Sequence, residues 1–318
     1  MSRIAAIGKA KGEKKPQKKR GGLHPIWPLY LMMIPAVIAV AIFAYLPMTG
    51  LIAAFKDYDI WGGFFGSPWA DNFGMAHFIE IFTNQQLMGS IGNTILLSLL
   101  NLGTTFPLQI LLALMFNELR GKRFKRTVQT ITYMPHFLSW ISIIGITTVL
   151  LDEYGMVNEL FLLFNPSHTR TLYLSEQWLF VPLLVFLNNW REIGYGSIFF
   201  LSAITSIDPQ LYEAAAVDGA GRLRQAWHIT LPGISTTAVV LFILNIGGIL
   251  GSNFDLVYGL QNPFIDFDTI DTVIYKMGLG AGQYSMTIAL GLARGLIALG
   301  LTLMVNFFSK KVNDVSVL

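Results

Sequence analysis

Long apolar segments dominate this chain and restrict it to membrane folds. Six of them reach the roughly 20 residues that a helix needs to cross a bilayer. They cover 29–55, 90–115, 128–151, 178–203, 234–254 and 286–308. Only 13% of the residues are charged, whereas a soluble domain carries about 25%. The sequence therefore predicts an all-α polytopic membrane protein with six transmembrane helices.

The distribution of charge predicts the orientation of these helices. If the N-terminus lies inside, 17 of the 22 Lys and Arg residues fall on the inner side, and the outer loops carry 12 of the 19 acids. The positive-inside rule then places both termini in the cytoplasm. Residues 1–28 form a basic cytoplasmic tail suited to anionic membrane lipid. The apolar stretch after this tail is too long for a signal peptide, so we expect an uncleaved first span.

Several function classes lack their sequence signals. The chain has no cysteine, which excludes disulfides and thiolate chemistry. It has no phosphate-binding loop for ATP and no hydrolase or zinc-protease motif, so we expect it not to be a self-contained enzyme. Its basic residues lie at membrane edges and therefore indicate topology, with no nucleic-acid partner.

Two outer segments carry paired carboxylates of the form DxD, Asp57 with Asp59 and Asp266 with Asp268. Such pairs bind divalent metal in many nucleotide-sugar transferases. Both lie on the expected outer face, away from the cytosolic nucleotide pool. We therefore expect solvated acidic loops and no metal site, although a membrane-bound transferase remains an alternative.

Three charges fall within the predicted spans: Arg191, Glu192 and Arg294. A charge at the bilayer centre costs about 2.5 kcal/mol or more unless it meets a partner or a wet cavity. Neighbours on a helix point about 100° apart, so Arg191 and Glu192 are not expected to neutralise each other. One interpretation is a Glu192–Arg294 ion pair between helices.

The other interpretation is a polar path for a solute. Asn188, Asn189, Trp190 and Arg191 would line this path, with Arg294 opposite. Amides, an aromatic ring and guanidinium groups suit hydroxyls, sugar faces and carboxylates. If both arginines face the path, an acidic sugar suits it better than a neutral one. Other polar residues of the spans are expected to join helices to one another: Asn93, Thr94, Asn101, Gln109 and His136.

Residues 208–232 form a polar segment between two apolar spans, on the expected cytoplasmic side. Asp208 is a suitable N-cap with Pro209 at the first helical position, and Asp218-Gly219 predicts a break. After the break, apolar residues recur at a spacing of four, at Leu223, Trp227 and Leu231. The pattern predicts two short helices, which could be a docking surface or an ordinary solvated hairpin.

The same segment resembles the EAA loop of permease subunits of ATP-binding-cassette (ABC) importers. The resemblance rests on the order Glu213-Ala214-Ala215, Gly219 and Ile229-Thr230-Leu231-Pro232. It implies that 208–232 is the coupling loop, seated in a groove of a cytosolic ATPase. By analogy, Glu213 pairs with a basic residue near that groove and Gly219 supplies the turn. The coupling residues implied are Glu213, Ala214, Ala215, Gly219, Ile229, Leu231 and Pro232.

Further stretches are similar to the LplB-like group of carbohydrate uptake transporters, at 50–59, 116–140, 189–209 and 305–311. The resemblance implies a type I ABC importer transmembrane domain over 29–318, with a MetI-like core at about 90–309. It also implies a second permease, two ATPase subunits that bind ATP and Mg, and a solute-binding protein. The expected substrates are oligosaccharide or polysaccharide fragments, carried across the cell membrane, with no cofactor in this chain.

Two other kinds of transporter remain alternatives. A secondary sugar transporter would need intramembrane carboxylates to couple an ion gradient, and Glu192 is the only acid in a predicted span. An ABC permease for a solute other than a sugar would share the coupling loop but not the sugar path.

Overall fold

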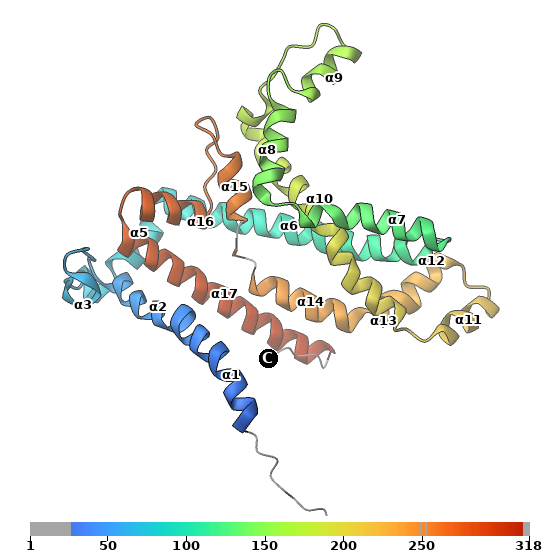
Figure 1. The fold of residues 1–318 in the computed structure, drawn as a ribbon, viewed down its shortest axis with the longest axis horizontal. Helices are drawn as coiled ribbons and strands as arrows, with labels where there is room; N and C mark the ends of the chain where they lie inside the picture. Colours follow the sequence, from blue (N-terminus) through green and yellow to red (C-terminus); the bar gives the residue numbers. More distant parts are fainter. Residues whose placement is uncertain (1–26, 249, 252, 314–318) are drawn as a thin grey trace, which may run out of the picture. The chain divides into compact units, whose positions relative to one another are not determined.

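The computed structural model describes residues 27–313 except 249 and 252, so the predicted tail at 1–28 lies almost wholly outside the described residues. The chain divides into two units, Met1–Gly50 and Leu51–Leu318. Within the described part, every regular element is a helix, and Lys56 and Trp69 form an isolated bridge. Figure 1 shows the course of the chain.

The described part of the first unit is an apolar helix. It consists of α1 (Trp27–Val40), the π-helical turn η1 (Ala41–Tyr45) and α2 (Leu46–Met48), and the 3-10 helix η2 (Thr49–Phe55) leads from it into the second unit. None of the residues in α1, η1 or α2 is buried in the chain. A helix that is apolar all round and exposed is suited to lipid. Trp27–Phe55 coincides with the predicted first span.

Two long helices form the centre of the second unit, α6 (Gln85–Glu118) and α10 (Gln177–Thr205), and they pack against each other. Glycines in α10 allow close contacts. A Cβ on Gly194 would lie 2.0 Å from the Thr132 carbonyl oxygen of α7 (Lys122–Tyr133), and one on Gly196 would lie 2.0 Å from Gln109 Nε2 of α6. Figure 1 shows α6, α7 and α10 side by side.

The predicted continuous span 128–151 is wrong in its middle. Helix α7 ends at Tyr133, a 3-10 turn η3 follows (Met134–Phe137), and α8 begins at Trp140 and ends at Leu151. Pro135 lacks an amide hydrogen, so it favours a helix start over continuation. Ser139 then caps α8 by accepting a hydrogen bond from the Ser142 amide at 3.2 Å.

The outer segments predicted as loops, at about 56–89, 152–177 and 255–285, contain short helices. These are α3 (Gly63–Gly66), α4 (Asp71–Gly74), α5 (Ala76–Thr83), α9 (Met156–Phe164), the 3-10 turn η4 (Tyr173–Ser175), α15 (Phe254–Leu260), α16 (Ile270–Val273) and the π-helical η6 (Ile274–Gly280). The predicted span 234–254 is shorter, since α14 runs from Ser235 to Gly247. It packs against α17 (Tyr284–Asn313).

Three apolar clusters hold the second unit together. One joins α8, α10 and α15 around Ile143, Leu184 and Val257. Another joins α5, α16 and α17, and the third joins α6, α10 and the start of α14. Polar residues at the centres of α6 and α10 lie outside these clusters and face a cavity.

The described residues contain four helices that are long and apolar enough to cross a membrane: Trp27–Phe55, Gln85–Glu118, Trp140–Phe164 and Tyr284–Phe307. A fifth is present if Arg222–Gly233 and Ser235–Gly247, which are bent by 60°, count as one span. Helix α10 is also long, but polar residues occupy its middle. The structure is thus an all-helical membrane protein with four to five candidate spans, where the sequence predicted six.

Candidate functional site

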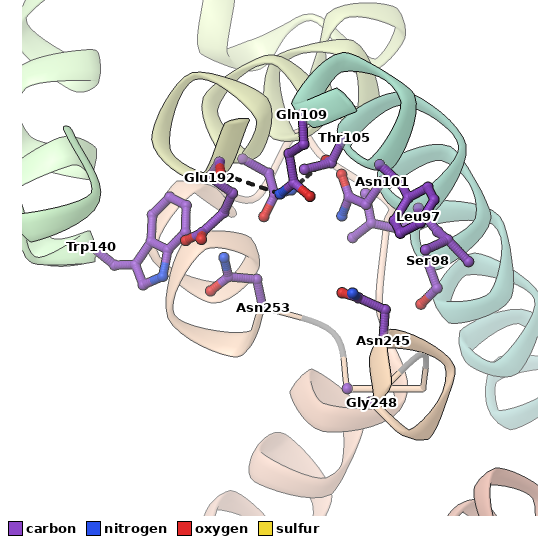
Figure 2. A pocket seen from close by; sticks show the side chains of 14 residues that line it. Leu97, Ser98, Asn101, Thr105, Gln109, Trp140, Glu192, Asn245, Gly248 and Asn253 are labelled. Carbon is purple, nitrogen blue, oxygen red and sulfur yellow. Dashed lines mark hydrogen bonds between the residues drawn. The ribbon is translucent and has the colours of Figure 1, made fainter. Parts of the chain in front are cut away.

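A polar cavity of about 440 Å³ lies between α6, α8, α10, the end of α14 and the chain that follows it. Figure 2 shows its side chains facing one another across a common space. Carboxamides predominate, and Trp140 supplies an aromatic face. The lining residues with polar side chains or an aromatic ring at the cavity are Ser98, Asn101, Thr105, Phe106, Gln109, Trp140, Asn188, Glu192, Asn245 and Asn253.

Asn101 marks this cavity as more than a packing defect. Its Oδ1 atom is buried, and none of the described residues gives it a hydrogen-bond partner. Leaving such a group unsatisfied costs about 1–3 kcal/mol. Asn101 also lines the cavity, so its carboxamide lies beside any ligand that occupies it.

The residues predicted to form one path lie on different faces of α10. Asn188 lines the cavity. Asn189 instead joins α10 to α6 through Thr104, to which its Nδ2 donates at 2.9 Å, and through Thr105. Trp190 borders a separate apolar cavity of about 250 Å³ with Ile143 and neighbours of both helices. Successive residues of a helix point about 100° apart, which accounts for this separation.

The expectation that Arg191 and Glu192 do not neutralise each other is wrong. Arg191 Nη1 contacts Glu192 Oε1 directly, because both side chains are long enough to bend toward each other. Arg191 also donates from Nε to the Leu138 carbonyl at 3.3 Å. Glu192 Oε2 lies 3.1 Å from His136 Nδ1. Glu192 reaches the cavity, whereas Arg191 is occupied at its edge.

The Glu192–Arg294 pair, one of the two interpretations of these charges, is not formed. Arg294 on α17 pairs with Asp271 on α16, a residue that the sequence placed in an outer loop. Its Nη2 atom would lie 3.6 Å from a Cβ on Gly251, which lines the cavity. Arg294 therefore approaches the cavity at its Gly251 side, with part of its charge balanced by Asp271.

The other polar residues of the spans mostly join elements, as predicted. Asn93 donates to the Asp268 carbonyl at 2.9 Å, the Ile270 amide donates to Thr94 at 2.8 Å, and Gln109 donates to the Glu192 carbonyl at 3.3 Å. Asn101 departs from this expectation. Sequence reasoning missed Trp140, Asn245 and Asn253, because only the fold brings their three separate segments together.

A second candidate site is the segment 208–232, where the predicted break is present. Asp208 caps α11 (Pro209–Val217) by accepting a hydrogen bond from the Gln210 amide at 2.9 Å. Gly219 adopts φ +78°, a conformation that favours glycine. Helix α12 (Arg222–Gln225), the π-helical η5 (Ala226–Thr230) and α13 (Leu231–Gly233) follow.

Apolar side chains of this segment face outward. Leu223 is 80% exposed and Trp227 is 69% exposed, whereas Leu231 packs against the cluster around Phe200 and Ile234. Internal contacts shape the segment, including one between Tyr212 Oη and Thr230 Oγ1 at 3.0 Å. Leu211 and Val217 are exposed as well. Four large exposed apolar residues on a polar segment indicate an interaction surface.

The remaining predicted coupling residues lie around this surface. Glu213, Ala214 and Pro232 are exposed, and Ala215 and Ile229 are partly buried. Arg222 forms an ion pair with Glu118 at the end of α6, with both side chains at least half exposed.

One carboxylate of each DxD pair lies beside a basic side chain. Asp57 lies 3.2 Å from His77, and Asp268 lies 2.7 Å from Lys276 Nζ. Burial raises the pKa of Asp268, but hydrogen bonds from Lys276, Gln261 and Thr272 outweigh it and leave the pKa below its ordinary value. No group of three or more potential metal ligands occurs among the described residues.

Comparison with known proteins identifies the class of this chain. Residues 106–314, about two thirds of the chain, match the family described as binding-protein-dependent transport system inner membrane component. The chain is similar to the polygalacturonan/rhamnogalacturonan transport system permease protein YteP of Bacillus subtilis, at 44% identity over 95% of this chain and 94% of YteP. Protein LplB of the same organism is 40% identical over 89% of this chain and 88% of LplB.

A solved structure shares the fold. It is a bacterial alginate ABC transporter in complex with an alginate pentasaccharide-bound periplasmic protein, matched with a TM-score of 0.83 and 37% identity over 92% of this chain and 97% of that chain. The family match and this structural similarity agree with the observed fold, in which a long helix carries polar residues at its centre and the segment 208–232 is exposed. The chain belongs to the binding-protein-dependent transport system inner membrane components, the multi-pass permease subunits of ABC importers, and is not itself the catalytic subunit.

Proposed function

We propose that this chain imports fragments of an acidic polysaccharide, delivered by a solute-binding protein. The observation that carries the proposal is the carboxamide-rich cavity with the unpartnered Oδ1 of Asn101. Carboxamides both donate and accept, so they suit sugar hydroxyls, and Trp140 offers a face for a sugar ring. The relatives handle polygalacturonan, rhamnogalacturonan and the acidic polysaccharide alginate.

Within this cavity, a sugar carboxylate fits best toward Gly251. Arg294 supplies positive charge at that side, and Glu192 supplies negative charge elsewhere on the lining. The proposed sugar contacts are therefore Asn188, Asn101 and the carboxamides opposite them. Arg191, Asn189 and Trp190 would hold α10 in position beside the cavity and would not contact the sugar themselves.

The segment 208–232 is proposed as the coupling loop. The exposed Leu223 and Trp227 would seat in a groove of the ATPase, and Glu213 would pair with a basic residue beside it. ATP and Mg would bind to two such ATPase subunits, and a second permease would complete the pathway. Closure of the ATPases would move the loops and turn the permease pair from inward- to outward-facing.

The full topology is proposed as six spans with both termini in the cytoplasm. Helix α10 would be one span despite its polar centre, since that centre faces a cavity, and α7 with α8 would be another, interrupted by η3. Basic residues at the α6–α7 turn support this orientation: Arg120, Lys122, Arg123, Lys125 and Arg126.

The test is ATP hydrolysis by the assembled transporter in liposomes, with binding protein and an oligomer of galacturonate. We expect sugar-loaded binding protein to stimulate hydrolysis. The double variant Glu213→Ala with Gly219→Pro should abolish the stimulation while the permease pair stays assembled. Proline fixes φ near −65°, so it cannot adopt the φ of +78° found at position 219.

Three outcomes would redirect the proposal. Unchanged stimulation in the double variant removes the coupling assignment. Stimulation by a neutral oligosaccharide but not by oligogalacturonate removes the acidic substrate. Transport that needs an ion gradient and no ATPase favours a secondary transporter.

A further inference from the structure

Two consecutive residues of α10, Arg191 and Glu192, contact the segment that separates α7 from α8. On one side of the break, the His136 ring stacks on Tyr195 with centroids 3.8 Å apart and lies 3.1 Å from Glu192. On the other side, the Arg191 guanidinium covers the Trp140 ring at 4.5 Å. Arg191 also donates to the Leu138 carbonyl within the break. The direction in which α8 leaves α7 thus depends on Arg191 and Glu192.

Glu192 connects this arrangement with the cavity. One of its carboxylate oxygens contacts Arg191 and the other lies beside His136. Its side chain is 27% exposed, and it lines the cavity together with Trp140. A carboxylate offers about four acceptor positions, so Glu192 can accept a hydrogen bond from a ligand as well. The same group therefore faces both the ligand and the break.

We infer that Glu192 is a positioning residue that transmits occupancy of the cavity to the break between α7 and α8. The inference rests on the proposed function, because a saccharide must occupy the cavity. A sugar hydroxyl that donates to Glu192 competes with His136 and Arg191 for the carboxylate. A sugar ring on Trp140 competes with the Arg191 guanidinium for that face. Both changes loosen the contacts that direct α8.

Other contacts hold α7 in place without Glu192. Gly194 brings α10 against the Thr132 carbonyl of α7, and Ser139 caps α8 by itself. Loss of the Glu192 charge should therefore alter the break without unfolding the helices. Movement of α8 would then be passed to the second permease, and through it to the ATPases.

The absence of cysteine in this chain allows a direct measurement. Cysteines placed at the exposed Ile131 of α7 and Val149 of α8 carry spin labels, and the assembled transporter is placed in lipid nanodiscs. The distance between the labels is measured with empty and with oligogalacturonate-loaded binding protein. We expect a sugar-dependent shift in the otherwise unaltered chain and its loss in Glu192→Gln.

The same samples give the ratio of sugar-stimulated to basal ATP hydrolysis. In Glu192→Gln this ratio should fall about fivefold or more, the lower range of measured couplings between sites. Glu192→Asp keeps the charge at shorter reach and should recover part of both signals. Glu159→Gln is the control, because it breaks the ion pair between Glu159 on α9 and Arg170, and neither residue lines the cavity.

The inference is overturned if Glu192→Gln retains both the distance shift and the stimulation ratio. It is also overturned if the unaltered chain is stimulated by sugar without any shift. If the unaltered transporter shows no stimulation by loaded binding protein, the proposed function fails and this inference falls with it. A variant that does not assemble is replaced by Glu192→Asp, for which full retention of the ratio together with a lost shift also contradicts the inference.

Discussion

The coupling segment and the polar cavity are built in opposite ways. Residues 208–232 are consecutive, and their large apolar side chains, Leu223 and Trp227, face outward. The cavity is instead lined by residues of α6, α8, α10, α14 and the chain beyond α14, and their polar side chains face inward. The coupling segment exposes apolar groups on its surface. The cavity encloses polar groups, which are thereby kept out of contact with the lipid.

This difference teaches where each function is encoded. A short helical pair with a glycine turn is determined by its own sequence, because caps and turns act over a few residues. A cavity between long helices depends on which faces meet, and one residue along a helix changes the face by about 100°. Substitutions should therefore separate the two regions, with stability lost in one and partner binding lost in the other.

The largest expected effect comes from Gly194→Ala. The new Cβ would lie 2.0 Å from the Thr132 carbonyl oxygen, which is backbone and cannot move aside. Overpacking of this kind costs about 1–3 kcal/mol and sometimes more. We expect a sharp loss of assembled permease in detergent, measured as monodisperse yield and melting temperature.

Gly219→Ala is the matched change in the coupling segment. A Cβ there meets nothing within 4 Å, so only the positive φ opposes it, at roughly 1–2 kcal/mol confined to a surface turn. The permease should assemble normally. Equal losses for the two glycines would show that the cavity region is not the tighter of the two.

The next effect should be that of Trp227→Ala on ATPase binding. This ring is 69% exposed, so its removal leaves the permease fold intact, but an aromatic anchor in a groove contributes about 2 kcal/mol or more to binding. We expect the affinity for the ATPase subunits to fall about 30-fold in a surface-binding assay. Trp61→Ala is the control, since Trp61 is 95% exposed on the far side of the predicted topology. A similar loss with both variants would remove Trp227 as the anchor.

Asn101→Leu tests the cavity with a change of nearly equal size. Removing a buried carbonyl that has no partner should leave the melting temperature unchanged or raise it. The concentration of sugar-loaded binding protein that gives half-maximal ATP hydrolysis should rise several-fold, because one acceptor for the sugar is lost.

Asn189→Leu is its comparison on the neighbouring helix. Asn189 bonds to Thr104 and Thr105, so its loss removes the hydrogen bonds that its side chain makes between α6 and α10. This variant should lose stability first. If Asn101→Leu destabilises as much as Asn189→Leu and leaves the sugar dependence unchanged, Asn101 is structural.

The same contrast explains what the sequence could predict. The cap at Asp208 and the break at Gly219 were predicted from local rules, and the structure confirms them. The predicted apolar stripe is divided, because Leu223 and Trp227 are exposed whereas Leu231 packs against the chain. The partners of Arg191, Glu192 and Arg294 were not, because they depend on which side chains the folded helices bring within reach. Asp271 lies outside every predicted span, and His136 lies at a break that the run of apolar residues concealed.

The smallest expected effect concerns the ion pair that joins the two regions, Glu118 at the end of α6 with Arg222 in the coupling segment. Both side chains are at least half exposed, and such pairs contribute about 0.2–1 kcal/mol or nothing measurable. Glu118→Gln should therefore change ATPase affinity by less than about threefold, and less still at high salt. Asp271→Asn, in the less exposed pair with Arg294, should destabilise the permease more. If Glu118→Gln uncouples hydrolysis while Asp271→Asn does not, the surface pair carries the signal from the helices to the loop, and packing through Leu231 and Tyr212 does not.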